Sequence, residues 1–441
     1  YVHIPFCVRK CAYCDFNSYA GLEPLFAPYV RALAGEMRSR VADQGPLHVR
    51  TLYVGGGTPT ALPLSLLGDV LSACHASVDV AASAEVTVEA NPGTVDEGYL
   101  AGLLAAGVSR LSLGVQSFDD GELQLLGRLH DAGQARQAYR QARAAGFHNV
   151  NLDLIFGLPG QTVARWRATL QQALALGPEH LSLYALTLEE HTPLAGRIAR
   201  GELPAPDDDL AAEMYELAEA ELARAGYVHY EISNWARPGF ECRHNLIYWR
   251  NQPYLGLGAG AHSWFAGRRW ANVCLPRIYV EEMARGHLPV AESEEISPAL
   301  EMAETAILGL RLVEEGVNLG AFRARFGAEF TDVYGREVEE LVDLGLLEAS
   351  TGRVRLTRRG RLLGNQVFQR FLPGQTRVRT SHREIRTSHA PRTTHHATRN
   401  TSIYSSNTSR TLYNTWLRSY GFCRKPCTPA SRISCACPFW L

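Results

Sequence analysis

The chain has 441 residues, of which 46% are hydrophobic and 20% charged, and its formal net charge is −1. These values are typical of a globular protein with two or three domains, and they exclude a fibrous or low-complexity chain. No run of ~18 uncharged apolar residues occurs, so we expect no transmembrane segment. The chain opens on a strand-like run rather than on Met or a secretory signal, so we expect a short piece to precede Tyr1.

Six short β-rich runs, each followed by a helical pattern, occupy the first half of the chain. The runs are 1–6, 51–57, 84–92, 110–118, 149–159 and 180–187. Segment 131–146, for example, is rich in helix-forming residues and ends on Gly. Strands that alternate with helices predict an α/β fold with a parallel sheet and right-handed crossovers. Polar residues at the strand ends favour an incomplete (β/α) barrel over a doubly wound sheet, because barrels assemble their sites there. We expect this barrel to span residues 1–205.

The pattern changes after residue 205. Residues 206–297 start with a predicted helix over 208–225 and continue as a loop-rich stretch, which we expect to complete the barrel. Residues 298–372 end in a helix, a short strand, a turn and a second strand. This order of elements predicts a small winged-helix-like α+β domain. We expect this domain to pack rather than to bind DNA, because neighbouring acidic residues offset its Arg residues.

Residues 373–441 differ from the rest in composition. They hold 11 Lys plus Arg against the single Glu384, and 20 of the 69 residues are Ser or Thr. Such a segment buries too little apolar surface to offset its ordering entropy, so we predict a disordered basic tail, whose abrupt onset favours an out-of-frame extension. Zinc binding by its cysteines is the alternative. The remaining body is mildly acidic, so we expect no nucleic-acid partner.

Three cysteines, Cys7, Cys11 and Cys14, follow the first predicted strand in a C-x3-C-x2-C arrangement. Structural zinc sites and fully protein-ligated iron–sulfur clusters need four ligands, so a three-cysteine loop leaves one metal position open, as in working sites. His3 as a fourth zinc ligand is the alternative, which Pro5 makes awkward. Without a secretory signal, such a cysteine group more often binds metal than forms disulfides, which favours a cytoplasmic location.

The cysteine motif resembles that of the radical S-adenosylmethionine (SAM) superfamily. With "GGGTPT", "EANPGT", "GVQSF", "NLDLIFGLPGQT" and "HLSLYALT", it is similar, more narrowly, to the oxygen-independent coproporphyrinogen III oxidase-like family, and the likeness runs in order through residues 1–372. The resemblance implies that the three cysteines hold one [4Fe–4S] cluster, whose open iron takes the amino and carboxylate groups of SAM. It assigns no catalytic residue.

The resemblance also implies which residues contact SAM. Glycines allow close backbone approach and their peptide groups bond polar ligand ends. An Arg suits a carboxylate, and an Asp suits ribose hydroxyls. The implied contacts are Tyr1, Tyr13, Gly56, Gly57, Thr58, Glu89, Gln116, Arg128, Asp153 and Ala185.

Two features favour one branch of this family. Phe16 stands where the oxidases carry a further cysteine, and the run His244-Asn245-x-x-Tyr248-Trp249 is similar to a motif of the heme chaperone (HemW-type) branch. The likeness implies that segment 206–297 binds heme and that His244 ligates it. It also implies that heme passes to heme-accepting respiratory proteins from the cytoplasm or the inner face of the membrane. Two alternatives stay open: oxidative decarboxylation of coproporphyrinogen III, and a His244 that only packs a loop beneath the barrel mouth.

Overall fold

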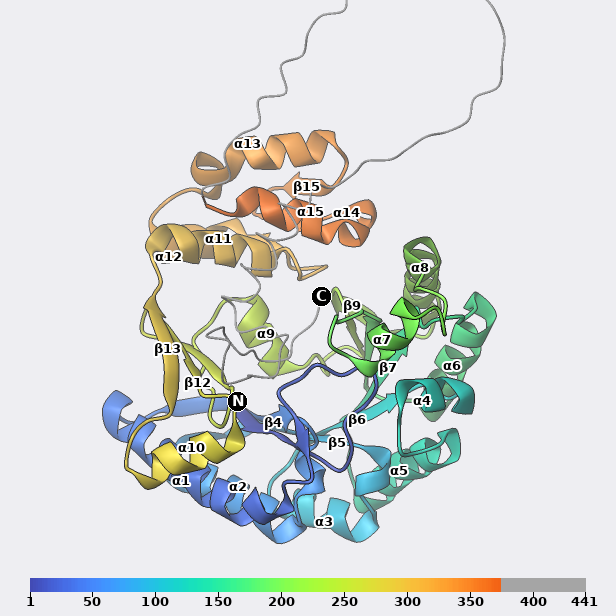
Figure 1. The fold of residues 1–441 in the computed structure, drawn as a ribbon. Coiled ribbons are helices and arrows are strands. Elements are labelled where there is room, and N and C mark those ends of the chain that lie inside the picture. The colour runs from blue at the N-terminus through green and yellow to red at the C-terminus, as the bar shows by residue number, and fades with distance from the viewer. Residues whose placement is uncertain (374–441) are drawn as a thin grey trace, which may run out of the picture.

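The computed structural model describes residues 1–373, and a large α/β unit with a smaller domain at one end makes up this part of the chain (Figure 1). The main sheet has the strand order β1-β4-β5-β6-β7-β8-β10-β9. Its first six strands run parallel, and β10 and β9 run antiparallel to β8 and to each other. The strands are β1 (Val2–Ile4), β4 (His48–Gly56), β5 (Asp79–Ala90), β6 (Arg110–Gln116), β7 (Val150–Phe156), β8 (His180–Ala185), β9 (Val228–Glu231) and β10 (Asn234–Ala236).

Helices connect the parallel strands and cover one side of the sheet (Figure 1). The sheet has β1 and β9 as its edges, so the predicted α/β fold with an incomplete barrel is confirmed, and each of the six predicted runs supplies one parallel strand. The helices are α1 (Phe26–Gln44), α2 (Leu64–Ser77), α3 (Glu97–Ala105), α4 (Asp120–Leu126), α5 (Ala132–Ala145), α6 (Val163–Leu176), α7 (Pro193–Ala199) and α8 (Asp208–Arg224), with 3₁₀ turns at 23–25, 59–61 and 92–94.

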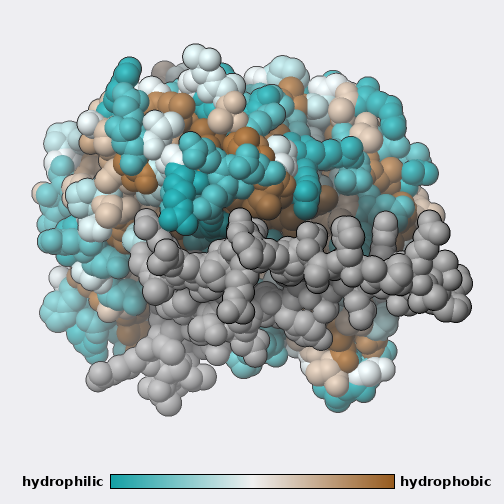
Figure 2. All heavy atoms as spheres, turned by 90° about the horizontal axis from the view of Figure 1, so that it is seen from above, coloured by the Kyte–Doolittle hydropathy of each residue, from teal (hydrophilic) through white to brown (hydrophobic). Residues whose placement is uncertain are grey.

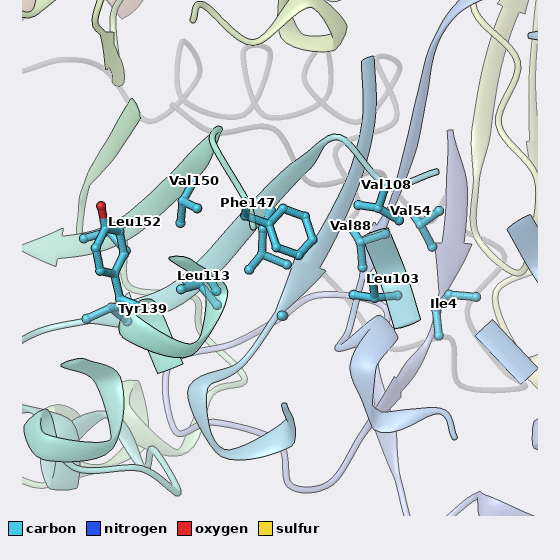
Figure 3. Close-up of a cluster of buried hydrophobic side chains, with 14 of the residues drawn as sticks. Ile4, Val54, Val88, Leu103, Val108, Leu113, Tyr139, Phe147, Val150 and Leu152 are labelled. Carbon is cyan, nitrogen blue, oxygen red and sulfur yellow. The ribbon is translucent and has the colours of Figure 1, made fainter. Parts of the chain in front are cut away.

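The strands alternate between two environments. On β6, Leu111 and Leu113 point into the apolar core beneath the helices, whereas Arg110 and Ser112 point to the other side. Figure 3 shows the apolar side, where residues of five parallel strands meet side chains from the helices and their connections. The labelled residues are Ile4, Val54, Val88, Leu103, Val108, Leu113, Tyr139, Phe147, Val150 and Leu152. The polar side chains are thereby left to line the barrel interior.

The expectation of a loop-rich stretch before residue 297 is wrong. That stretch holds α9 (Arg243–Trp249), α10 (Pro276–Ala284) and a three-stranded antiparallel sheet of β11 (His262–Phe265), β12 (Arg268–Asn272) and β13 (Val290–Glu295). Every residue of β13 is exposed, so its sequence lacks the apolar alternation of a half-buried strand. Pairing of opposite charges, such as Arg268 opposite Glu295, helps to set its register.

The C-terminal domain has its own core and the predicted winged-helix-like order. Helices α11 (Pro298–Gly309), α12 (Leu319–Phe326) and α13 (Phe330–Asp343) pack against a small sheet in the order β14-β16-β15. The remaining elements are β14 (Val317–Asn318), β15 (Leu347–Ser350), β16 (Arg353–Leu356), α14 (Arg358–Leu362), α15 (Gly364–Phe368) and a 3₁₀ turn at 369–371. Several of its Arg side chains pair with Glu, among them Arg361 with Glu219 of α8 at 2.8 Å.

The helices and the surface of residues 1–373 bear on the expectation that the chain has no transmembrane segment. No helix in this part of the chain is long and apolar enough to cross a membrane. Hydrophilic side chains dominate the face seen in Figure 2, with smaller hydrophobic areas between them. The predicted basic tail lies outside the described residues, apart from its first residue, Pro373.

Candidate functional site

The cysteine loop is held in place by backbone contacts at both of its ends. The short strands β2 (Phe6–Cys7) and β3 (Tyr19–Ala20) pair in parallel and close the loop. Within it, the Ala12 N–H donates to the Leu126 carbonyl at 2.9 Å, and the Ala12 carbonyl accepts from the Leu194 N–H at 2.9 Å. Cys7, Cys11 and Cys14 are half-buried and carry free thiols. A loop fixed in this way places all three cysteines along the wall of one cavity.

The glycine loop after β4 lies directly against the cysteine loop. A Cβ atom on Gly57 would lie 2.6 Å from the Phe6 carbonyl oxygen and 3.0 Å from the Cys7 sulfur, so no larger residue fits. Gly56 has φ +120°, and a Cβ there would lie 2.5 Å from the His3 ring. Thr58 donates from Oγ1 to the Cys7 sulfur at 3.6 Å. Close packing of the two loops therefore depends on glycine.

The predicted cluster and SAM residues converge on one open cavity of about 1160 Å³, a volume that includes solvent at its mouth. All of them except Tyr1 line it. Asp153 lies in the middle of β7 rather than at its end, but its side chain still faces the interior because the residue falls on the polar side of the strand. The predicted lining residues are Cys7, Cys11, Tyr13, Cys14, Gly56, Gly57, Thr58, Glu89, Gln116, Arg128, Asp153 and Ala185.

Two buried carboxyl groups form part of the cavity wall. Glu89 accepts hydrogen bonds from the Tyr53 hydroxyl at 2.7 Å and from the Gly56 N–H at 2.9 Å. Burial raises the pKa of Glu89 to about 7. Asp153 accepts from the Asn151 amide at 2.7 Å, and burial raises its pKa as well. Both groups are therefore held closer to their neutral form than in water.

Arg128 connects the thiols to the strand ends. Its Nη1 donates to the Cys11 sulfur at 3.3 Å, and its Nη2 donates to the Gly114 carbonyl at 2.5 Å and to the Asn91 side chain. Gln116, at the end of β6, has φ +69°, a left-handed conformation that is costly for a residue with a side chain. Strained backbone of this kind is concentrated at functional sites, and here it turns the chain at the cavity rim.

Tyr1 lies behind the cavity wall. Its hydroxyl bonds Nδ1 of His3 at 2.9 Å, and Nε2 of His3 donates to the Asn17 carbonyl at 2.9 Å. Burial lowers the pKa of His3 to about 4, so its ring is neutral. Because both ring nitrogens are engaged, His3 is not available as a fourth zinc ligand.

His244 is buried in α9 with both ring nitrogens engaged. Nδ1 bonds Thr51 Oγ1 at 2.8 Å and Nε2 bonds the Tyr248 hydroxyl at 3.1 Å, while the ring stacks on Tyr53 with centroids 5.0 Å apart. Burial lowers the pKa of His244 well below its usual range. Ligation of a heme iron through Nε2 would require displacement of the Tyr248 hydroxyl.

The donors at this site fit an iron–sulfur cluster better than a single metal ion. Within residues 1–373, no three His, Cys, Asp or Glu side chains converge closely enough to hold one metal ion. A cluster spreads its ligands over separate irons, so it suits three cysteines along one loop. Burial raises the pKa of Cys14 to about 12, and metal binding would draw off such thiol protons.

The cavity also contains residues that sequence reasoning missed. They lie on strands of the main sheet, in the loop after β5 and on α9. The sequence assigned none of them a role, although Asn91 belongs to "EANPGT" and Asn245 to the run that starts at His244. The available signal was the alternation of polar and apolar residues in runs such as "RLSLGVQ" and "VNLDLIF", which marks a polar interior face. These residues are Tyr53, Asn91, Arg110, Ser112, Asn151, Ser182 and Asn245.

Comparisons with known proteins identify the family of this chain. A family model described as the radical SAM superfamily matches residues 1–173, and one described as the HemN C-terminal domain matches residues 296–363. The chain is 38% identical over 373 residues to heme chaperone HemW of Bacillus subtilis, covering 84% of this chain and 98% of that protein. The HemW of Mycobacterium tuberculosis is 41% identical over 377 residues, covering 84% and 94%. The chain belongs to the HemW family.

The fold of this HemW family member also resembles a solved structure. Coproporphyrinogen III oxidase (HemN) from Escherichia coli superposes with a TM-score of 0.74 and 24% identity, covering 84% of this chain and 88% of that one. At this level of identity the likeness supports the fold alone. For a radical SAM protein, the family itself implies a [4Fe–4S] cluster and SAM.

Proposed function

We propose that this chain is a heme chaperone that binds one [4Fe–4S] cluster, SAM and heme and passes heme to an acceptor protein. The main support for this proposal is that one cavity is lined by the three thiols, the glycine loop and the acidic residues of the parallel strands. The names of the HemW relatives support the chaperone role. Acceptors of the respiratory chain, reached from the cytoplasm or the inner face of the membrane, belong to the same proposal.

In this proposal the residues of the cavity bind and orient the cofactors. Cys7, Cys11 and Cys14 would hold the cluster, and the backbone of Gly56 and Gly57 would receive the amino group of SAM. When bound and reduced, the cluster supplies an electron that can cleave SAM. The other predicted residues of the cavity would position SAM, and Tyr1 would act from behind the cavity wall. These cavity residues are Tyr13, Thr58, Glu89, Gln116, Arg128, Asp153 and Ala185. We further propose a division of the chain into three units. Residues 1–205 form the radical SAM core barrel, residues 206–297 complete the barrel and contain the heme-binding segment, and residues 298–372 form the winged-helix-like domain.

Phe16 bears on the rival activity, decarboxylation of coproporphyrinogen III. Its side chain forms part of the cavity wall, half-buried, where it can supply apolar contact but no thiolate. Anaerobic assays with SAM, a reductant and coproporphyrinogen III distinguish the two functions. We expect no protoporphyrinogen; its formation would favour the oxidase.

Removal of one cysteine at a time tests the cluster. After anaerobic reconstitution, Cys7→Ala, Cys11→Ala and Cys14→Ala should each lose the visible absorption of the cluster and most of the bound iron, because a two-cysteine remnant cannot hold it. Cys74→Ala is the control, since Cys74 is buried in the core away from the cavity and should leave the iron content unchanged. Full iron in any loop variant would contradict the assignment.

Titration with hemin tests His244. If Nε2 ligates the iron, His244→Ala should weaken hemin binding and shift the Soret band. Tyr248→Phe should strengthen binding roughly two- to tenfold, because it removes the hydrogen bond of ~0.5–1.5 kcal/mol that competes for Nε2. An unchanged spectrum and affinity in His244→Ala would mean that this side chain only packs α9 beneath the barrel mouth.

A further inference from the structure

Two polar side chains in the cavity have no partner in the described part of the chain. Arg110, the first residue of β6, is 2% exposed, and Asn245 of α9 is 5% exposed. Both line the cavity, and the Nε atom of Arg110 and the Oδ1 atom of Asn245 are buried without a hydrogen bond. A buried guanidinium without a hydrogen-bonded counter-charge is unfavourable, so this arrangement is typical of a site that a ligand completes.

The acids that face Arg110 are each occupied by other donors. Glu89 and Asp153 accept from the groups described above, at 2.7–2.9 Å and 2.7–3.1 Å. Glu85 accepts from the backbone N–H groups of Arg243 and His244 at 3.2 and 3.1 Å. Among residues 1–373, no carboxylate lies within ion-pair distance of the Arg110 guanidinium. These carboxylates therefore leave the Arg110 guanidinium without a hydrogen-bonded anion, the role that a bound ligand would fill.

The position of Arg110 separates it from the thiols. Arg110 and Gln116 are the two ends of β6, so their Cα atoms lie ~20 Å apart at ~3.3 Å per residue. The thiol end of the cavity has its own guanidinium, Arg128, bonded to Cys11. Arg110 instead neighbours Cys242 and Glu85, beneath α9. A ligand group that binds Arg110 is therefore held far from the open metal position.

We propose that Arg110 and Asn245 form a carboxylate-binding subsite at the inner end of the cavity, a proposal that rests on the proposed heme binding. A guanidinium pairs with a carboxylate through two parallel hydrogen bonds, and the Asn245 amide can turn its NH2 group toward the same ligand. Heme carries the required group in its propionates. The carboxylate of SAM is expected at the open iron instead, far from Arg110.

Ligands with and without the carboxylate test the subsite. The cluster-loaded full chain is titrated with hemin and hemin dimethyl ester, and separately with SAM and decarboxylated SAM. If the subsite holds a propionate, the wild type binds hemin at least tenfold more tightly than the ester, and Arg110→Met binds both equally. The preference for SAM over decarboxylated SAM should be the same in the wild type and Arg110→Met, because the carboxylate of SAM is expected at the cluster. Loss of the SAM preference in Arg110→Met would contradict a subsite for propionates.

Retention of the preference for hemin over its dimethyl ester in Arg110→Met would overturn the subsite, even if the wild type binds hemin. A wild type that binds no hemin would contradict the proposed chaperone function and the subsite with it. Arg110→Lys keeps the charge and checks folding if Arg110→Met is unstable. Asn245→Asp should weaken the carboxylate ligand at least tenfold more than Asn245→Ala does, because it places an anion in the subsite; equal effects would count against the proposal.

Discussion

Individual residues in this barrel serve different purposes according to the side of the strand on which they fall. Val88 and Glu89 are neighbours on β5, where Val88 packs in the apolar core and the Glu89 side chain faces the cavity. The sequence indicated Glu89 because it ends a predicted strand. It did not indicate Arg110, which starts one, because a charged residue at a strand start is ordinarily solvated. Only the closing of the sheet buries that position.

The buried carboxyl of Glu89 should make stability depend on pH. Its pKa is about 7 in the folded chain and 4.5 in the unfolded chain, so the folded state retains a proton that the unfolded state loses. Stability from this group is complete below pH 4.5 and falls as the pH rises to 7, by at most ~3 kcal/mol. In the cofactor-free protein, Glu89→Gln should therefore show a smaller loss of melting temperature between pH 5 and pH 8.

The exposed Glu97→Gln is the matched control for that measurement, since Glu97 lies at the start of α3 away from the cavity. Equal pH dependence in the wild type and Glu89→Gln would contradict a raised pKa for Glu89.

At the scale of elements, α9 joins the barrel interior to the rest of the molecule. The helix has no side-chain cap of its own, and the carboxylate of Glu85 on β5 accepts from its first N–H groups. Asn245 faces the cavity from this helix, and Trp249 at its other end packs on Leu308 and Leu312. The helix is thus fixed by groups distant in sequence, which local patterns do not reveal.

Loss of the Glu85 carboxylate should destabilise α9. Glu85→Ala leaves buried N–H groups of α9 unsatisfied and removes a negative charge from the neighbourhood of Arg110, so we expect the free energy of unfolding to fall by ~2 kcal/mol or more. Glu85→Gln keeps one acceptor oxygen and should cost less. Denaturant unfolding followed by circular dichroism measures both. Equal stability of Glu85→Ala and the wild type would contradict the capping role.

The whole molecule contains two separate apolar cores, one in the barrel and one in the C-terminal domain. Trp249 lies between them, with the Arg311 guanidinium 4.4 Å from its ring centroid, and Arg250 pairs with Glu315 at 2.6 Å. The buried ion pair between Arg269 of β12 and Glu304 of α11 also joins the barrel unit to the C-terminal domain. Trp249 is therefore one of several contacts between the two units, and it supplies buried aromatic surface.

Trp249→Ala should uncouple the two cores. We expect a loss of ~3–5 kcal/mol, the usual cost of removing a buried Trp. Calorimetry of the full chain should show one unfolding transition for the wild type and two for the variant, because the C-terminal domain then unfolds independently. Arg323→Ala, on an exposed face of α12, is the control and should retain one transition. A single transition in Trp249→Ala would mean that other contacts carry the coupling.

The sequence by itself determined the six parallel strands, the helix over 131–146 and the three-cysteine loop. A capping box at Asp131 starts that helix, and Gly146 in a left-handed conformation ends it. These features depend on short-range sterics, on the period of burial along an element and on residues within one loop, all of which local sequence contains.

Only the tertiary structure decided which distant residues meet. It bonded His244 to Thr51, 193 residues away, and brought Arg110 and Asn245 to one cavity. It also paired the exposed β13 with β12. Such contacts depend on how the sheet closes and on what covers its edges, and the pattern of any single segment contains no information about either.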